Sequence, residues 1–326
     1  MSKIALAIHG GAGTILRSRM TPALEAEYRS GLETALKTGW SALESGAAAL
    51  DAVETTVRAL EDFPLFNAGK GAVFTHEGEV ELDAAIMDGS TKRAGGVTFV
   101  KNIRNPISLA RLVMEQTEHA LLAGEGANQF AEQMGVETAP DEYFFTEHRW
   151  LQLQEALAAG RVQLDHTGTP ISDSNFQIER ESRIWDLGSK PMGTVGAVAC
   201  DVQGHLAAGT STGGMTNKRF GRVGDSALIG AGTFADDVCA VSCTGHGEDF
   251  MLGVTAYDVA ARMRYAGQSL KEAAQASIDQ LTTIDGEGGL IAVDSEGNVT
   301  LPFNSEGMYR GFVDSGGNLT VQIYGV

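Results

Sequence analysis

The sequence predicts an α+β fold in which helices cover an antiparallel sheet. Strands gather in hairpins, because 195–201 and 205–212 flank one short turn, and 290–294 and 298–303 flank another of the same plan. Apolar residues spaced three and four apart predict helices that cluster away from these hairpins. Segregated strands and helices favour an antiparallel sheet over alternating βαβ units.

The chain begins with a predicted strand and two predicted helices. Ile4–Ile8 forms a short apolar strand that runs into a glycine-rich turn at 9–13. Thr21 is placed to cap a helix with proline at its first position, and apolar residues recur every four positions over 24–36. The apolar residues over 50–60 predict the second helix.

The remaining elements follow from the same signals. Strands are expected around 73–74, 82–87 and 96–100, and helices near 107–115, 126–134, 147–159 and 252–263. Ser269 and Glu272 form a capping box that opens a last helix. The polar, turn-rich stretch without periodicity predicts a flexible linker over about 160–193.

Composition narrows the class of protein. The 326 residues suit one large domain or two intimately packed ones, and the net charge of −18 without a basic cluster argues against nucleic acid or an anionic membrane as partner. No apolar stretch approaches the ~20 residues of a membrane span, and the apolar run at the N-terminus is too short for a signal peptide. The three cysteines form no C-x-x-C pair, so buried free thiols and a cytoplasmic location are expected.

Thr194 is the candidate nucleophile. It opens an apolar strand directly after Gly193, at the end of the predicted linker. If the Gly193–Thr194 bond were cut, the new α-amine, with an ordinary pKa of about 7.7–8.0, could serve as the base for the hydroxyl. A single G-T-V-G motif equally suits a threonine that merely caps a strand.

Other polar turns offer further candidate site residues, and each of them also has a purely structural interpretation. Asn67 is a neutral side-chain donor for a carbonyl oxygen, or part of a turn before a strand. Thr212 returns toward Thr194 in the predicted hairpin, or simply ends a hydroxyl-rich strand. The turn at 9–13 fits neither the dinucleotide pattern nor the Walker pattern, so nucleotide binding is disfavoured.

Arg222 and Asp225 suit a zwitterionic substrate. Arginine binds a carboxylate bidentately and aspartate binds an ammonium, although the two could also pair with each other on the surface. At 242–248 a strand runs into a helix, whose first backbone N–H groups are donors for developing negative charge. His246 in this turn is a weaker candidate for a base, and the seven scattered histidines form no metal motif.

Together these segments resemble the plant-type L-asparaginases, or isoaspartyl peptidases, among the N-terminal nucleophile hydrolases. Eight motifs in family order carry the resemblance: I-H-G-G-A-G at 8–13, P-L-F-N-A-G at 64–69, L-D-A-x-x-M-D-G at 82–89, G-T-V-G-A-V-A at 193–199, S-T-G-G-M-T-N-K at 211–218, G-R-V-G-D-S at 221–226, T-G-x-G-E at 244–248 and P-F-N-x-E-G-M-Y-R at 302–310. The resemblance makes the nucleophile the favoured interpretation of Thr194.

The resemblance implies a four-layer αββα sandwich made as a precursor that cuts itself at Gly193–Thr194. The α chain would be 1–193 and the β chain 194–326, together one domain, with two αβ units pairing. It also implies roles for individual residues. These are Thr194 as nucleophile with Thr212 beside it, Asn67 close by, Thr244 and Gly245 as the oxyanion hole, and Arg222 and Asp225 with Gly245 and Gly247 holding the substrate. A structural sodium ion, and no catalytic cofactor, would be bound by the backbone carbonyls of Leu60, Glu61, Phe63, Phe66, Ala68 and Lys70.

The implied activity is hydrolysis of β-aspartyl dipeptides and L-asparagine through an aspartyl-threonine ester. An aspartylglucosaminidase-like amidase is the alternative, but such relatives usually carry aspartate before the threonine and are exported, whereas Gly193 stands here. A non-enzymatic scaffold is a third possibility, against which the complete set of candidate residues argues.

Overall fold

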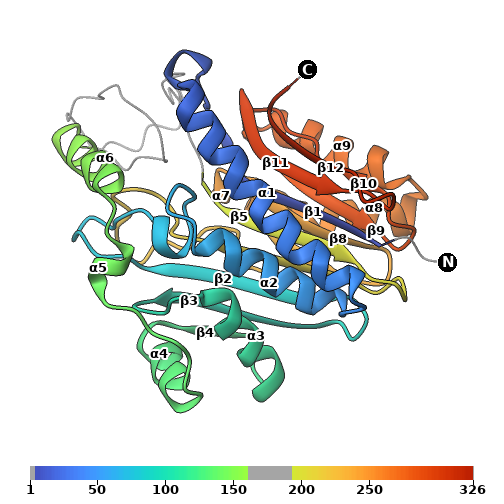
Figure 1. Ribbon diagram of the computed structural model, residues 1–326, viewed down its shortest axis with the longest axis horizontal. Coiled ribbons are helices and arrows are strands. Elements are labelled where there is room, and N and C mark those ends of the chain that lie inside the picture. Colours follow the sequence, from blue (N-terminus) through green and yellow to red (C-terminus); the bar gives the residue numbers. More distant parts are fainter. Residues whose placement is uncertain (1–3, 161–192, 326) are drawn as a thin grey trace.

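The computed structural model describes residues 4–160 and 193–325, and the predicted linker therefore lies almost wholly outside the described residues. Within them the protein is an α+β fold built on two sheets (Figure 1). The eight-stranded sheet has the order β12 (Leu319–Tyr324), β11 (Gly307–Val313), β1 (Ala5–Gly13), β5 (Val195–Cys200), β6 (Leu206–Thr212), β2 (Leu82–Asp88), β3 (Arg93–Val100), β4 (Leu121–Ala123). The four-stranded sheet has the order β10 (Val299–Thr300), β9 (Gly288–Asp294), β8 (Cys239–Gly245), β7 (Thr233–Ala235). Neighbouring strands run antiparallel except β3 and β4.

The helices largely follow the predicted periodicities. They are α1 (Pro22–Glu44), α2 (Ala49–Glu61), α3 (Pro106–Gln116), α4 (Gly124–Gln133), α5 (Asp141–Phe144), α6 (Glu147–Ala158), α7 (Gly247–Gly253), α8 (Thr255–Ala266) and α9 (Leu270–Thr282). Thr21 caps α1 by accepting the Leu24 N–H, and Ser269 and Glu272 complete both halves of the capping box of α9. These two predicted helix starts are confirmed.

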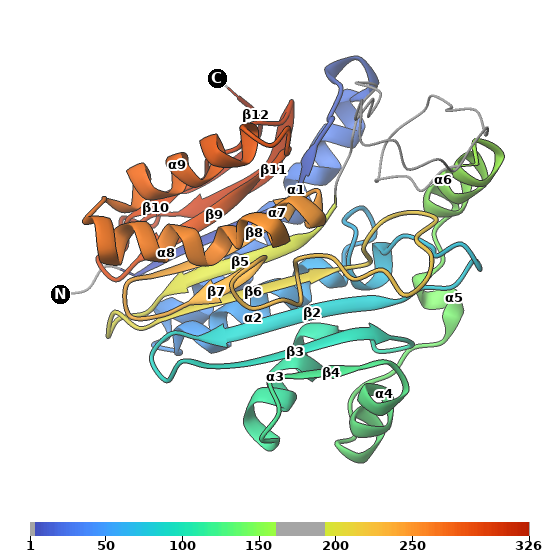
Figure 2. The same cartoon turned by 180° about the vertical axis from the view of Figure 1, so that it is seen from behind.

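Three buried clusters hold the elements together. One lies between α1, α2 and α3 and the large sheet, and includes Leu32, Val53 and Ile107. A second joins α8 and α9 to the small sheet, and a third, with Met87 and Val198, lies where the two sheets face each other. Figures 1 and 2 show α1 and α2 on one side of the molecule and α8 and α9 on the opposite side.

Two predicted elements differ from the structure. The residues 9–13 form no turn but continue β1, with a bulge opposite β11 between His9 and Gly11. Glycines there indicate a turn, yet Gly11 at φ 117° and Gly13 at φ 147° lie in a distorted strand instead. Residues 73–74 form no strand, since they lie outside any ladder.

The hairpin β11–β12 was not predicted, although its turn has the same pattern as the turns of the two predicted hairpins. In each of three hairpins an aspartate Oδ1 accepts two backbone N–H groups, two and four residues ahead: Asp201, Asp294 and Asp314. A glycine follows each aspartate by three residues and adopts a positive φ. The Asp-x-x-Gly signal at 314–317 could therefore have revealed this hairpin.

Glu61, at the end of α2, makes the stability of the protein depend on pH. Burial raises its pKa from 4.5 to about 8, against hydrogen bonds that its carboxylate accepts from Ser211 and Ile107. The unfolded chain releases this proton near pH 4.5, whereas the folded protein keeps it up to about pH 8. The free energy of unfolding therefore falls as the pH rises from about 4.5 to about 8.

We expect Glu61→Gln to flatten this dependence of the unfolding free energy on pH in urea denaturation series, whereas the surface variant Glu118→Gln keeps it. An unchanged slope in Glu61→Gln would contradict the assignment.

Candidate active site

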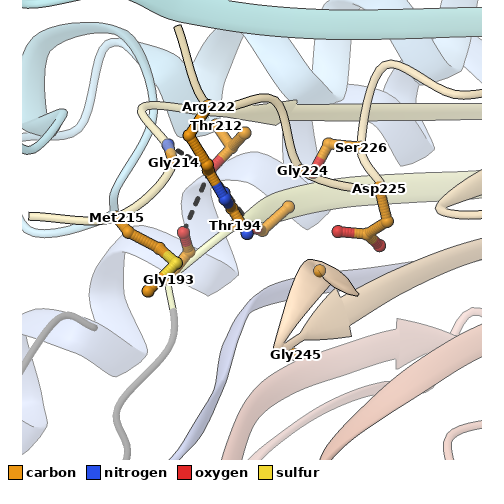
Figure 3. A pocket seen from close by; sticks show the side chains of 11 residues that line it. Gly193, Thr194, Thr212, Gly214, Met215, Arg222, Gly224, Asp225, Ser226 and Gly245 are labelled. Carbon is orange, nitrogen blue, oxygen red and sulfur yellow. Dashed lines mark hydrogen bonds between the residues drawn. The ribbon is translucent and has the colours of Figure 1, made fainter. Parts of the chain in front are cut away.

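A small pocket opens at the start of β5, where the predicted nucleophile stands (Figure 3). Its lining combines residues from the start of β5, the end of β6, the loop that follows β6 and the end of β8. The lining residues are Gly193, Thr194, Thr212, Gly214, Met215, Arg222, Gly224, Asp225, Ser226, Gly245 and Gly247. Every one comes from the second half of the chain. Six of them are predicted site residues, and they come from four separate segments of the sequence, not counting Gly193 of the predicted cut.

The hairpin β5–β6 brings two hydroxyls together. Val195 pairs with Ser211, so Thr194 and Thr212 are the next facing pair, and their Oγ atoms lie 3.2 Å apart. Thr212 Oγ1 also accepts the Gly214 N–H at 2.9 Å and donates to the Gly193 carbonyl oxygen at 3.2 Å. The hydroxyl of Thr194 therefore donates a hydrogen bond to Thr212, which lies beside it as predicted.

Asn67 holds the same carbonyl from the other half of the chain. Its Nδ2 donates to the carbonyl oxygens of Gly193 at 2.7 Å and Gly214 at 2.8 Å, while its Oδ1 accepts the Val73 N–H at 3.0 Å. The Gly193 oxygen thus has two donors, one from Asn67 and one from Thr212. This is the arrangement that stabilises a carbonyl oxygen when negative charge develops on it.

Arg222 and Asp225 face the pocket but do not bond to each other. Arg222 Nε and Nη2 donate to the Glu248 carboxylate at 2.8 and 2.7 Å. Burial acts to lower the pKa of Arg222, but Glu248, together with the charges of Asp225 and Asp83, raises it. Burial raises the pKa of Asp225 to about 7, although the charge of Arg222 opposes it. Asp225 Oδ2 is buried without a hydrogen-bond partner in the described part of the chain, and Oδ1 lies beside Gly247 of the lining, so the carboxylate suits a cationic group in the pocket.

Two glycines give the charged pair its room. A Cβ on Gly247 would lie 2.9 Å from both Arg222 Nη2 and Asp225 Oδ1, and a Cβ on Gly224 would lie 2.9 Å from Arg222 Nη1. A side chain at either position would push against the guanidinium. Gly247 also opens α7, whose first N–H groups point toward this end of the helix.

Thr244 and His246 lie next to the pocket rather than on its lining. Thr244 is fully buried, and its Oγ1 accepts the Ala12 N–H at 3.2 Å, across the bulged end of β1. His246 contacts two acidic side chains, Asp249 at 3.1 Å and Glu248 at 3.4 Å. It is placed to support Glu248, and the weaker interpretation of His246 as a base gains no contact with Thr194.

Sequence reasoning missed several contributors. Glu248 stands in the T-G-x-G-E motif but was given no role in the site, yet its carboxylate holds Arg222. Met215, Gly224 and Ser226 stand inside the quoted motifs but were given no role. In the described ranges no group of three or more His, Cys, Asp or Glu side chains is placed to hold a metal ion, and no helix there is long and apolar enough to cross a membrane.

A hydroxyl nucleophile beside donors for a carbonyl oxygen is the arrangement of an amide hydrolase. The chain belongs to the asparaginase family, whose model matches residues 2–323. It is 50% identical to the isoaspartyl peptidase of Escherichia coli (strain K12), over 99% of this chain and 97% of that protein. It is also 42% identical to a plant-type L-asparaginase of Pyrococcus abyssi, over 97% of this chain and 98% of that protein. The family to which the motifs pointed is confirmed.

Proposed function

We propose that this protein is a self-processing hydrolase that acts on β-aspartyl dipeptides and L-asparagine and releases L-aspartate. The observation that carries the proposal is the pairing of Arg222 and Asp225 in one pocket with the hydroxyl of Thr194. Arg222 suits the α-carboxylate of an aspartyl group and Asp225 suits its α-ammonium, which directs the β-carbonyl toward the hydroxyl. The names of the relatives in Escherichia coli and Pyrococcus abyssi support the same substrates.

Self-cleavage would use the contacts at Gly193. The Thr194 oxygen attacks the Gly193 carbonyl carbon while its proton leaves through Thr212, and Asn67 and Thr212 stabilise the oxygen that becomes negative. The C–N bond then breaks, the Thr194 nitrogen takes up the proton that left its hydroxyl through Thr212, and an ester joins Gly193 to the Thr194 oxygen. Water hydrolyses this ester, which leaves a carboxylate on Gly193 and a free amine on Thr194.

Substrate hydrolysis would repeat this chemistry with the new amine as base. The amine of Thr194 takes the hydroxyl proton, the oxygen attacks the β-carbonyl carbon, and the N–H of Gly245, which lines the pocket with Thr244 buried directly behind it, stabilises the oxyanion. The leaving nitrogen accepts the proton and departs as ammonia or an amino acid. Water then attacks the aspartyl ester, and L-aspartate leaves the regenerated threonine.

We further propose that the layers described above form the αββα sandwich of the N-terminal nucleophile hydrolases, and that two αβ units pair. Exposed apolar side chains on α7 and α8 support pairing, because Leu252 is 76% and Tyr265 is 74% exposed. Light scattering of the purified protein tests the pairing. A cytoplasmic location stays a prediction that rests on three buried free thiols.

We also propose that a structural sodium ion stiffens the loop that carries Asn67. Its ligands would be backbone carbonyl oxygens, which suit a hard cation. They belong to Leu60, Glu61, Phe63, Phe66, Ala68 and Lys70. Two glycines support this packing, since a Cβ on Gly69 would lie 2.6 Å from the Glu61 oxygen and one on Gly71 would lie 2.2 Å from the Phe66 oxygen. The ion would take no part in the reaction.

Replacing the nucleophile tests the proposal directly. We expect Thr194→Ala to stay uncut and to show no hydrolysis of a β-aspartyl dipeptide, because both reactions need its hydroxyl. Thr194→Ser, which keeps a hydroxyl, should cut itself and retain some activity. Intact mass under denaturing conditions reports the cut, and an amine-release assay reports hydrolysis. Activity in Thr194→Ala would refute the mechanism.

Arg222 should separate the two reactions. Arg222→Ala removes the partner of the substrate carboxylate, so kcat/KM should fall by about 10²-fold or more, while self-cleavage proceeds. Arg222→Lys keeps the charge but loses the planar fork, so its kcat/KM should lie between those of the unsubstituted protein and Arg222→Ala. If Arg222→Ala also stops self-cleavage, the residue serves the architecture of the site and not only the substrate.

The pH dependence should report Asp225. Because its pKa is raised to about 7 in the free protein, Asp225 is increasingly protonated below that pH and loses its attraction for the substrate ammonium. We expect kcat/KM for L-asparagine to fall below about pH 7 more steeply than kcat, since bound substrate keeps Asp225 ionised. In Asp225→Asn the difference between the two profiles should vanish. Parallel profiles in the unsubstituted protein would contradict this role.

A further inference from the structure

Behind the pocket, buried polar side chains from both sheets form a continuous line that ends at the nucleophile's own backbone. The line contains His9, Ser242, Thr210 and Thr233, all fully buried. His9 Nδ1 lies 2.9 Å from the Thr194 carbonyl oxygen, and His9 Nε2 lies 2.8 Å from Ser242 Oγ. Ser242 Oγ lies 2.7 Å from Thr210 Oγ1, which lies 2.6 Å from Thr233 Oγ1.

The Thr194 carbonyl fixes the direction of these hydrogen bonds. A carbonyl oxygen can only accept, so His9 Nδ1 carries a hydrogen. Burial lowers the pKa of His9 to about 3, so the ring is neutral, and Nε2 accepts the hydrogen of the Ser242 hydroxyl. The Ser242 oxygen then accepts from Thr210. His9 is therefore a fixed donor and not an acid or base.

This donor acts where the sheet provides no backbone partner. The register of β5 begins at Gly196 against β1 and at Val195 against β6, and Thr194 precedes both. Once the bond to Gly193 is cut, Thr194 is tethered only through its carbonyl side. Rotation about its Cα–C bond would then move both the hydroxyl and the amine, and the hydrogen bond from His9 opposes that rotation.

Gly196 provides the space that this contact requires. A Cβ on Gly196 would lie 2.0 Å from Ser242 Oγ and 2.4 Å from His9 Nε2. Any side chain there would separate the imidazole from the hydroxyl. The second glycine of the G-T-V-G motif thus has a physical explanation, two residues beyond the nucleophile.

We propose that His9, supported by Ser242, is a positioning residue that fixes the orientation of Thr194 through its carbonyl oxygen. The inference rests on the proposed role of Thr194 as nucleophile. It assigns His9 no contact with substrate, so its loss should lower kcat and leave KM unchanged. A displacement of reacting atoms by about 1 Å can cost roughly 10²-fold in rate.

Two substitutions of His9 separate the two ring nitrogens. The amide nitrogen of asparagine reaches the place of Nδ1 and can still donate to the Thr194 carbonyl, whereas the longer glutamine reaches the place of Nε2. We expect His9→Gln to lower kcat for a β-aspartyl dipeptide by about 10²-fold with KM within about twofold, and His9→Asn to stay within about tenfold of the unsubstituted kcat. Rates are expressed per cut molecule, as measured by intact mass.

Ser242→Ala is the milder companion, because it leaves His9 in place without its supporting hydroxyl. It should lower kcat less than His9→Gln and should leave the pH profile unchanged. It also carries the test if His9→Gln fails to fold, which thermal unfolding reveals. A His9→Gln protein that folds but does not cut itself, beside a His9→Asn protein that does, supports the proposal equally.

Three results would overturn it. They are an unchanged kcat in both His9→Gln and Ser242→Ala, equal losses in His9→Asn and His9→Gln with a matching fall in Tm, and a shifted pH profile in Ser242→Ala. The first removes the role, the second makes it merely structural, and the third makes His9 a titrating group. Failure of the proposed function is distinct, since the unsubstituted protein would then neither cut at Gly193–Thr194 nor hydrolyse the dipeptide.

Discussion

The antiparallel ladder between β5 and β6 is the constraint on which the rest of the site depends. It makes Thr194 and Thr212 a facing pair, and the pairing of Thr212 with Asp83 on β2 fixes β6 in turn. A slip of one residue would turn every side chain of β5 to the opposite face of the sheet. The buried clusters on both faces of β5 exclude that slip. The packing of the core therefore also fixes the position of the Thr194 hydroxyl.

The charges of the pocket are arranged around one internal ion pair. Glu248 holds the Arg222 guanidinium in its fork, and His246 stands behind Glu248. Arg222 is thereby oriented in advance, so binding of the proposed substrate carboxylate would cost less entropy. The buried Oδ2 of Asp225 lacks such a partner among the described side chains. Of the two residues proposed to bind a zwitterionic substrate, Arg222 is therefore held by an ion pair and Asp225 is not.

Local signals in the sequence predicted local structure well. The caps at Thr21 and Ser269 and the facing threonines of the β5–β6 hairpin all follow from short-range rules and are confirmed. The contacts that sequence reasoning missed join residues far apart in the chain, such as His9 with Ser242 and Ala12 with Thr244. Their partners are chosen by how two sheets stack, which no spacing of residues encodes. Glycine misled the prediction at 9–13, because a bulged strand uses it as readily as a turn does.

The order of strands gives the cut a topological meaning. In the large sheet β12 and β11 come from beyond residue 194, β1 from before it, β5 and β6 from beyond it, and β2, β3 and β4 from before it. Strands of the two fragments of a cut chain would therefore alternate within one sheet, and hydrogen bonds would join the fragments along three separate ladders. Neither fragment could leave without dismantling the centre of the sheet. Such a pair is held by a kinetic barrier as well as by affinity, and dilution alone would not part it.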